Sequence, residues 1–159
     1  MRVGIGYDIH RLAPGRPLRL GGLEVPADRG LVGHSDGDVV LHAICDAMLG
    51  AAGLGDIGDH FPDDDPALAG IDSAELVART LALVRKAGFA PANLDVNIIA
   101  EQPRLGPHKH AIRARVADLL GMAPESVSIK ARTAEGLGPV GEGLAIAAQA
   151  AVLVEETRR

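Results

Sequence analysis

The chain has 159 residues, with 16 lysines and arginines against 21 aspartates and glutamates, so its formal net charge is −5. This length suits a core that folds without disulfides or a structural metal, and we expect one domain over residues 1–159. The negative charge gives no general support for nucleic-acid binding. No stretch approaches the ~20 apolar residues that span a bilayer, so we expect no membrane association.

The single cysteine, Cys45, rules out an internal disulfide. It falls on the apolar side of a helical pattern, which favours a buried thiol over a catalytic one. The chain starts with Met-Arg-Val-Gly-Ile-Gly and lacks the regions of a secretory signal, so we expect a cytoplasmic protein. Only Tyr7, Phe61 and Phe89 are aromatic, so any bound nucleobase would be recognised by backbone hydrogen bonds rather than by aromatic stacking.

Hydrophobic patterning predicts strands and helices in mixed order. In chain order they are a strand (1–7), a hairpin around Gly21-Gly22 (18–25), a helix (38–53), a helix opened by the capping-box pattern Asp72-Ser-Ala-Glu75 (72–88), a strand (94–100), a helix (107–121) and a strand (127–133). The last run, residues 144–155, is ambiguous because its alanines favour a helix while its larger apolar residues alternate as in a strand.

Three residues have the pattern of metal ligands. Asp8 and His10 stand two positions apart at the end of the first apolar run, and His42 lies within the helix 38–53. Residues i and i+2 of a strand point to the same side, so this carboxylate and imidazole can reach one ion. Three protein ligands leave a tetrahedral zinc with one open position, as catalytic zinc sites have. The alternative is that Asp8 caps a turn and the histidines are unrelated surface residues.

The segment Gly33-His-Ser-Asp-Gly-Asp38 forms a polar, glycine-flanked turn directly before that helix. Free backbone N–H groups and the helix dipole could bind a phosphate there, with His34 and Ser35 as donors. Ser and Asp before a helix are equally typical N-caps. Asp46, one turn after His42, is a candidate to orient that imidazole, or else an exposed helical carboxylate.

Residues 53–70 form a long loop that contains five aspartates. Its glycines would let the backbone approach a ligand, and its carboxylates could accept hydrogen bonds from the hydroxyls of a sugar or polyol. The alternative is an ordinary acidic loop that faces solvent.

Two more segments follow predicted strands. Ala100-Glu-Gln-Pro-Arg-Leu-Gly106 has the composition of a short backbone cradle, in which Arg104 could reach a phosphate. In Arg132-Thr-Ala-Glu135, a hydroxyl and a carboxylate could hold a phosphoryl oxygen and a divalent cation. Each segment taken alone also fits a surface turn.

Taken together, these motifs resemble one family over essentially the whole chain. The motifs are Gly6-Tyr-Asp-Ile-His-Arg11, Gly33-His-Ser-Asp-Gly-Asp38 with His42, Gly55-Asp-Ile-Gly58, His60-Phe-Pro-Asp63 and Thr133-Ala-Glu135. In identity and spacing they are similar to the 2-C-methyl-D-erythritol 2,4-cyclodiphosphate synthases of non-mevalonate isoprenoid synthesis.

The resemblance implies an α/β (α+β) subunit, a single domain with a mixed β-sheet covered by helices. It implies a homotrimer whose sheets face the threefold axis and whose active sites lie between subunits, and it makes residues 144–155 a strand. The implied enzyme is a phosphorus-oxygen lyase. Its substrate, 4-diphosphocytidyl-2-C-methyl-D-erythritol 2-phosphate, would give 2-C-methyl-D-erythritol 2,4-cyclodiphosphate and cytidine monophosphate (CMP).

The resemblance also assigns roles to residues. Zn²⁺ would bind Asp8, His10 and His42, and Mg²⁺ or Mn²⁺ would bind Glu135 together with the substrate diphosphate. His34 and Thr133 would stabilise the transition state. The implied substrate contacts are Asp8, Ile9, His10, His34 and Ser35; then Asp56, Ile57, Gly58, Phe61, Pro62, Asp63, Asp64 and Asp65 around the erythritol; and Ala100, Glu101, Gln102, Pro103, Arg104, Leu105, Gly106, Ala131, Arg132, Thr133, Ala134 and Glu135 around the cytidine diphosphate.

The chain departs from the family pattern near Pro139, where a phenylalanine is common, and in Gly141-Glu-Gly143, where an arginine is missing. Two other functions compete with the synthase. One is a zinc phosphohydrolase, in which metal-bound water is the nucleophile. The other is a non-catalytic binding module whose fold depends on zinc.

Overall fold

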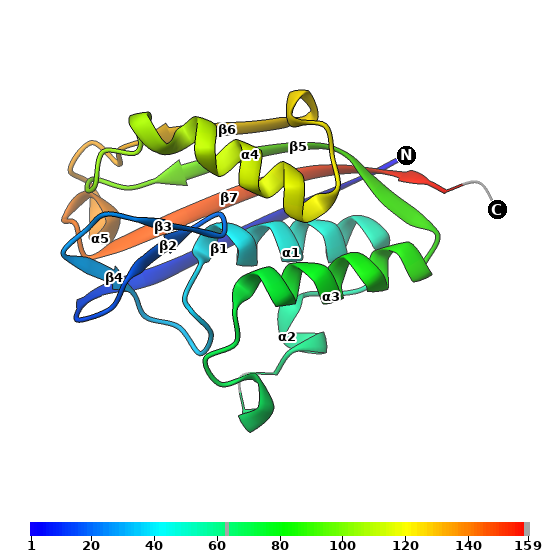
Figure 1. Cartoon of the computed structure of the whole chain (residues 1–159), viewed down its shortest axis with the longest axis horizontal. Coiled ribbons are helices and arrows are strands. Elements are labelled where there is room, and N and C mark those ends of the chain that lie inside the picture. The colour runs from blue at the N-terminus through cyan, green and yellow to red at the C-terminus, as the bar shows by residue number, and fades with distance from the viewer. Residues whose placement is uncertain (63, 158–159) are drawn as a thin grey trace.

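The computed structural model describes residues 1–62 and 64–157. Its elements, in chain order, are β1 (Arg2–Pro14), β2 (Leu18–Leu20), β3 (Leu23–Val25), β4 (Arg29–Leu31), α1 (Val39–Ala52), α2 (Ile57–His60), the 3₁₀ helix η1 (Pro66–Leu68), α3 (Ser73–Lys86), β5 (Phe89–Ile99), η2 (Gly106–His108), α4 (Lys109–Leu120), η3 (Pro124–Ser126), β6 (Val127–Arg132), α5 (Gly138–Gly141) and β7 (Ala145–Glu156) (Figure 1).

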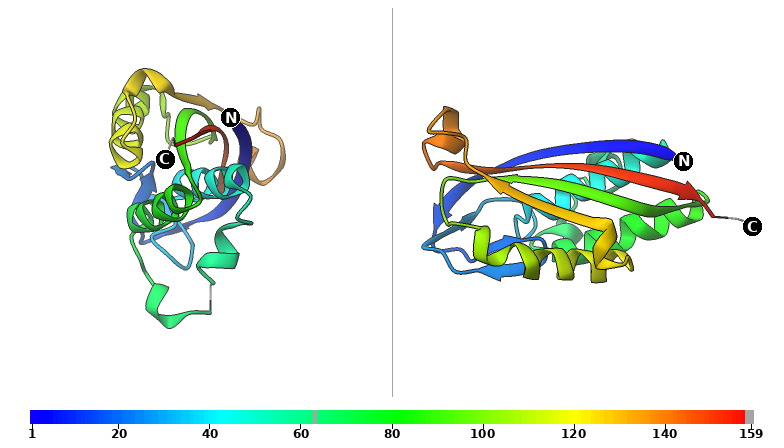
Figure 2. Two further views of the ribbon diagram at one scale, coloured as in Figure 1. Left: turned by 90° about the vertical axis from the view of Figure 1, so that its right-hand side faces the viewer. Right: turned by 90° about the horizontal axis from the view of Figure 1, so that it is seen from above.

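A five-stranded sheet in the order β4-β1-β7-β5-β6 forms the frame of the molecule. The β5–β6 pair is parallel and the other pairs are antiparallel, so the sheet is mixed, as the family resemblance implied. Figure 2 shows the long helices α1, α3 and α4 together on one face of this sheet. The main hydrophobic core lies between that face and the helices. In the part of the chain that the structure describes, no helix has the length and apolarity needed to cross a membrane.

Two glycines of β1 let helix α1 pack unusually close to the sheet. A Cβ atom added at Gly4 would lie 2.0 Å from the carbonyl oxygen of Ala47, and one added at Gly6 would lie 2.0 Å from that of Ala43. Both distances are far below van der Waals contact, so only glycine fits at these positions. Since Asp8 follows Gly6 by two positions on the same strand face, this close approach also brings Asp8 to helix α1.

On the opposite face of the sheet, Val140 of the short helix α5 packs against Ala145 and Ala147 of β7, while large apolar side chains of β1 stay exposed. Along β1 the side chains of Val3, Ile5, Tyr7 and Ile9 are 68%, 72%, 58% and 39% exposed. They alternate with Gly4, Gly6, Asp8 and His10, which face the helices. Exposed apolar rows of this kind are typical of surfaces that bind a partner.

The final run is the strand β7, which pairs with β1 on one side and β5 on the other. Its central place in the sheet outweighs the helix preference of its alanines, because helix propensity is a weak bias compared with packing and ladder hydrogen bonds. Strands β1 and β5 are longer than their patterns predicted, and the acidic loop contains α2 and η1. Asp72 accepts from the Ala74 N–H as a cap, while Glu75 pairs with Arg79.

Candidate functional site

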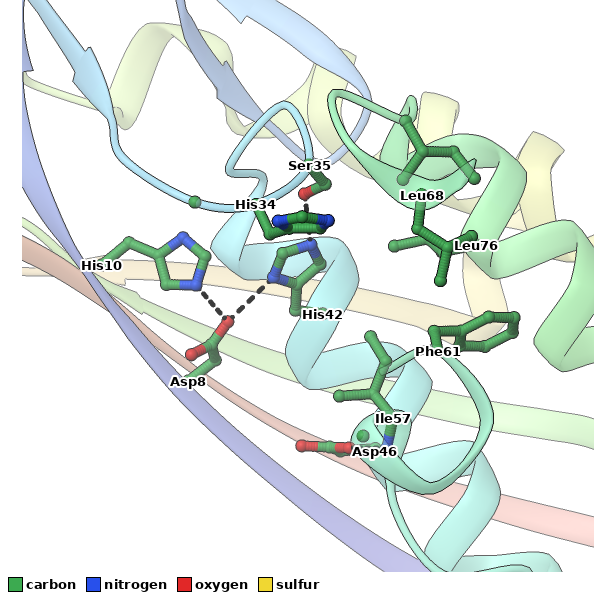
Figure 3. Close-up of a pocket in the computed structure, with 13 residues that line it drawn as sticks. Asp8, His10, His34, Ser35, His42, Asp46, Ile57, Phe61, Leu68 and Leu76 are labelled. Atoms are coloured by element: carbon green, nitrogen blue, oxygen red, sulfur yellow. Dashed lines mark hydrogen bonds and ion pairs between the residues drawn. The ribbon is translucent and has the colours of Figure 1, made fainter. Parts of the chain in front are cut away.

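Strand β1 and the first turn of helix α1 position the three expected metal ligands. Asp8 and His10 point to the helix side of the sheet, and His42 reaches them from α1 (Figure 3). The start of α1 is fixed by Asp38, whose fully buried carboxylate accepts from the N–H groups of Val40 and Leu41. The same carboxylate accepts from Gly21 and Gly22 in the β2–β3 turn. The expectation of an N-cap in this segment is therefore confirmed at Asp38.

The three side chains share one centre. The Oδ2 atom of Asp8 lies 2.9 Å from Nε2 of His10 and 3.0 Å from Nδ1 of His42. One ligand atom from each residue lies within 4.8 Å of the other two. The rings of His10 and His42 meet edge to face with their centroids 5.1 Å apart. A divalent cation could be held by all three atoms at once, which confirms the predicted metal-binding cluster.

Charge in this cluster is concentrated on Asp8. Burial alone would raise the pKa of Asp8, but the hydrogen bonds and positive charges of His10 and His42 outweigh it and hold the pKa well below its usual range. Burial would lower the pKa of His10, and the neighbouring Asp8 carboxylate instead raises it. The two histidines thus stabilise the negative charge of Asp8, and a metal ion would meet the same charge.

The other nitrogen of His42 faces away from this centre. Its Nε2 atom lies 2.9 Å from the hydroxyl of Ser35 and 3.1 Å from that of Ser73, the first residue of α3. Ser73 was not among the residues expected from the sequence, where it stands only as a helix-start residue. Ser73 and His42 are 31 positions apart in the sequence and belong to different helices, so no spacing pattern predicts their contact.

Beside the cluster lies a hollow of about 290 Å³. Its walls combine the metal-binding residues with parts of the predicted phosphate and erythritol segments and with apolar side chains of the η1–α3 region: Asp8, His10, Gly33, His34, Ser35, His42, Asp46, Ile57, Gly58, Phe61, Leu68, Ile71 and Leu76. Five of these residues, Gly33, Asp46, Leu68, Ile71 and Leu76, were not among the ligand contacts expected from the sequence. The hollow thus offers one polar end with metal ligands and one apolar end.

Asp46 lines this hollow without touching the His42 ring. Its Oδ1 atom accepts from the N–H of Ile57 at 2.8 Å, so it ties α2 to α1. The suggestion that Asp46 orients His42 is therefore wrong in this structure. The alternative of an exposed carboxylate is also wrong, because Asp46 is half-buried. Burial is the main cause that raises its pKa.

Several aspartates of the acidic loop serve local structure. Asp56 and Asp59 form a reciprocal capping box around α2, and Asp65 caps η1 through the N–H of Ala67. Asp63, an expected substrate contact, lies outside the described residues. Ile9 turns its side chain to the open face of the sheet, away from the metal ligands, so a substrate contact there would fall to its backbone.

The segments expected to bind cytidine form a second hollow, of about 510 Å³. It is lined by residues that follow β5 and β6: Ala100, Glu101, Pro103, Arg104, Leu105, Gly106, Pro107, Lys109, Ala131, Arg132 and Thr133. Gln102, also expected at the nucleotide, lines a neighbouring hollow with Pro103. Because β5 and β6 are parallel neighbours, the loops after them meet at the same sheet edge.

The turn after β6 is held together by carboxylates. Glu101 accepts from the N–H groups of Ala134 and Gly136, and the Thr133 hydroxyl donates to Oε1 of Glu135 at 2.9 Å. Glu135 has a positive φ of 53°, an unusual backbone for a residue other than glycine. Thr133 and His34, the two expected catalytic residues, thus line different hollows of one chain.

Comparison with known proteins agrees with this geometry. The sequence matches the YgbB family over residues 1–155. The chain belongs to the YgbB family. A curated family member from Symbiobacterium thermophilum, 2-C-methyl-D-erythritol 2,4-cyclodiphosphate synthase, is 56% identical over 77% of this chain and 78% of its own length. The resemblance inferred from the motifs is therefore confirmed.

Solved structures of YgbB-type proteins share the fold. A 2C-methyl-D-erythritol-2,4-cyclodiphosphate synthase in its CDP-bound form superposes with a TM-score of 0.89, at 38% identity, over 97% of this chain and 100% of that one. The bifunctional IspDF protein of Campylobacter jejuni gives a TM-score of 0.94 at 37% identity over 98% of this chain. The present chain spans 42% of that bifunctional protein.

Proposed function

We propose that this YgbB-family chain converts 4-diphosphocytidyl-2-C-methyl-D-erythritol 2-phosphate to 2-C-methyl-D-erythritol 2,4-cyclodiphosphate and CMP. The 2-phosphate oxygen forms a bond to the β-phosphorus of the diphosphate. The bond between that phosphorus and the bridging oxygen breaks, and CMP leaves with the electron pair. The observation that carries this proposal is the Asp8–His10–His42 cluster at the polar end of a hollow, in a chain 56% identical to a synthase of this name.

The physical task of such a reaction is to bring two anionic groups together in line across one phosphorus. Asp8, His10 and His42 would hold Zn²⁺. Glu135, which the family resemblance assigns to a second cation, would hold Mg²⁺ or Mn²⁺. When bound, these cations supply Lewis-acid stabilisation that contributes several kcal/mol, on the order seen for metal-assisted phosphoryl transfer. The substrate's own phosphate is the nucleophile, so the chain needs no serine or cysteine nucleophile.

The protein's own groups orient the reacting phosphates. His34 and Ser35 line the hollow beside the metal ligands, and both can donate hydrogen bonds to phosphate oxygens. Thr133 can donate to a phosphoryl oxygen from the second hollow once its hydroxyl leaves Glu135. Ile57, Phe61 and Leu76 close the apolar end of the first hollow, which suits the methyl-bearing carbon chain of an erythritol.

The second hollow suits the cytidine diphosphate. The synthase solved with CDP supports a nucleotide site in this family. Arg104 and Arg132 bring positive charge to the hollow, and the backbone around Ala100 offers groups that can read a base without aromatic stacking. Because His34 and Thr133 line different hollows of the chain, we propose that the complete active site forms between two subunits of a trimer.

The open face of the sheet supports this assembly. Val3, Ile5 and Tyr7 expose apolar side chains there, and a trimer would bury them around its axis. We expect Ile5→Asp to dissociate the trimer, measured by light scattering coupled to gel filtration, and to abolish turnover. The matched control is Ala114→Asp on the exposed side of α4, which should stay trimeric and active. A trimeric Ile5→Asp protein would contradict the proposed interface.

A subunit-mixing experiment tests where the active site lies. The His34→Ala and Thr133→Ala variants should each be nearly inactive. When the two are unfolded together and refolded, mixed trimers would contain sites with His34 from one subunit and Thr133 from the next, and activity should return. Activity that stays absent in the mixed, trimeric sample would place both residues in one subunit's site.

Product analysis decides among the candidate reactions. Phosphorus NMR of the reaction should show a cyclic diphosphate and CMP. A linear phosphate product would instead establish the zinc phosphohydrolase. Chelation of the metal should stop turnover and leave the circular dichroism spectrum unchanged, because the core lies between sheet and helices and not around the cluster. A chain that unfolds on chelation would support the binding module. A cytoplasmic location remains a prediction from the sequence.

A further inference from the structure

Behind His42 lies a partly buried hydrogen-bond chain whose further members, Ser73 and Asp36, do not line the hollow. The hydroxyl of Ser73, on a residue that is fully buried, lies 3.1 Å from Nε2 of His42. The same hydroxyl donates to Oδ1 of Asp36 at 2.5 Å. The carboxylate of Asp36 also accepts from the N–H groups of Ser73 and Asp38. Asp36 thereby joins the loop before α1 to the start of α3.

Counting hydrogens along this chain places one on Nε2 of His42. A serine hydroxyl has one hydrogen, and a carboxylate can only accept. The hydrogen of Ser73 goes to Asp36, so Ser73 presents a lone pair to Nε2 of His42. That nitrogen must then carry a hydrogen. The Nδ1 atom faces the Asp8 carboxylate and the shared centre, at 3.0 Å from Oδ2 of Asp8. A cation bound at that centre would take the place of any hydrogen on Nδ1, so the ring would keep its hydrogen on Nε2 and present the Nδ1 lone pair to the cation.

Ser35 plays a different part from Ser73. Its oxygen lies 2.9 Å from the same Nε2 atom and also accepts from the N–H of Gly37. Its own hydrogen has no carboxylate partner, and Ser35 lines the hollow whereas Ser73 does not. The hydrogen of Ser35 can go to the hydroxyl oxygen of Ser73, 3.3 Å away, or to a ligand in the hollow, whereas the hydrogen of Ser73 is committed to Asp36. Of the two serines, only Ser73 links the histidine to a carboxylate.

We propose that Asp36 and Ser73 are positioning residues that hold the hydrogen of His42 on Nε2 and so aim the Nδ1 lone pair at the metal centre. This inference concerns the metal site on which the proposed function rests, but it does not depend on the reaction. Neither residue touches the metal centre or the hollow. Hydrogen-bonded carboxylates behind histidine ligands commonly raise metal affinity by fixing the ring and its tautomer. Here the carboxylate acts through a serine.

The experiment measures zinc binding without substrate. The metal-free Ser73→Ala variant is titrated with zinc in competition with a coloured chelator, and we expect its dissociation constant to rise by about 10- to 100-fold. In the zinc-loaded protein labelled with ¹⁵N-histidine, the Nε2–H of His42 should exchange with solvent faster than in the wild type. A synthase that fails to cyclise its substrate would not affect either readout.

The matched control is Thr80→Val, which removes another fully buried hydroxyl from the same helix. Its zinc affinity and its His42 N–H exchange should equal those of the wild type. An equal loss of affinity in Thr80→Val would attribute the effect to the packing of α3 and overturn the proposal. So would a Ser73→Ala protein that is folded and binds zinc as tightly as the wild type.

A second variant covers the case in which Ser73→Ala does not fold. Asp36→Asn keeps the side-chain size but replaces one of two acceptor oxygens with a donor, so it cannot accept from both the hydroxyl and the N–H of Ser73. We expect a smaller rise in the zinc dissociation constant together with faster exchange of the His42 N–H. Unchanged values for both in a folded Asp36→Asn protein would reject the proposed role.

Discussion

The Nδ1 atom of His42 lies 3.0 Å from Oδ2 of Asp8, although 34 positions separate the two residues along the chain. Strand β1 supplies the carboxylate and helix α1 supplies the imidazole. Their contact depends on the glycines of β1, which let the helix backbone approach the strand. The metal site and the close packing of α1 on β1 are therefore parts of one arrangement.

We expect His42→Ala to abolish tight zinc binding and turnover and to change the free energy of unfolding by only about 1 kcal/mol. The side chain is 13% exposed at the edge of a hollow, so its loss leaves a space that water can fill. Zinc titration and urea denaturation measure the two effects. His110→Ala, on the exposed side of α4, is the control and should bind zinc normally. Full activity in His42→Ala would refute the metal assignment.

Alanine substitutions at two glycines near the contact between β1 and α1 should change the stability of the fold in opposite directions. Gly6→Ala places a Cβ atom 2.0 Å from the Ala43 carbonyl oxygen and should destabilise the fold by about 3 kcal/mol or more. Gly50→Ala, on the exposed side of α1, meets no atom closer than 4.0 Å and should stabilise the fold by about 0.5–1 kcal/mol. Chemical denaturation compares them. A tolerated Gly6→Ala would contradict the packing described above.

Arg104 is expected to bind a phosphate of the nucleotide. It is exposed and lines the second hollow, so its replacement by alanine should leave the fold intact and weaken CDP binding by about tenfold, as loss of one charged hydrogen bond does. Calorimetry with CDP gives the affinity. Arg85→Ala, at the exposed end of α3 and beside another hollow, serves as the control. CDP affinity that is equal in all three proteins would count against the phosphate role.

The Cys45 thiol should be inert in the folded protein. Burial is the main cause that raises its pKa from 9.0 to about 12, so the reactive thiolate is scarce at mildly alkaline pH. Below pH 9.0 the thiol is protonated in both the folded and the unfolded chain, so it does not affect the free energy of unfolding. Between pH 9.0 and about 12 only the unfolded chain loses this proton, so the free energy of unfolding falls as the pH rises. Iodoacetamide should label Cys45 only after denaturant is added. Rapid labelling of the native protein would show that the thiol is accessible.

Local chemistry along the sequence determined much of this protein. The spacing of Asp8 and His10, the helical phase of His42 and the Gly21-Gly22 turn each depend on neighbours a few positions away, and the structure has all three. The expectation of a strand at residues 144–155 came from the resemblance, because alanine pattern alone leaves helix and strand open. Its central place between β1 and β5 is a long-range property.

Only the tertiary structure decided which polar side chains serve the site and which serve the scaffold. Asp46 was one candidate to orient His42, with an exposed carboxylate as the alternative, but it binds the backbone of α2. Ser73 and Asp36 lie behind His42 without any signal in sequence spacing. A carboxylate or hydroxyl can satisfy its hydrogen bonds in many ways, and the choice depends on which backbone groups the packing brings within about 3 Å. Residue types thus determined which hydrogen bonds and metal contacts were possible, and the packing of α1 between β1 and α3 determined which of them form.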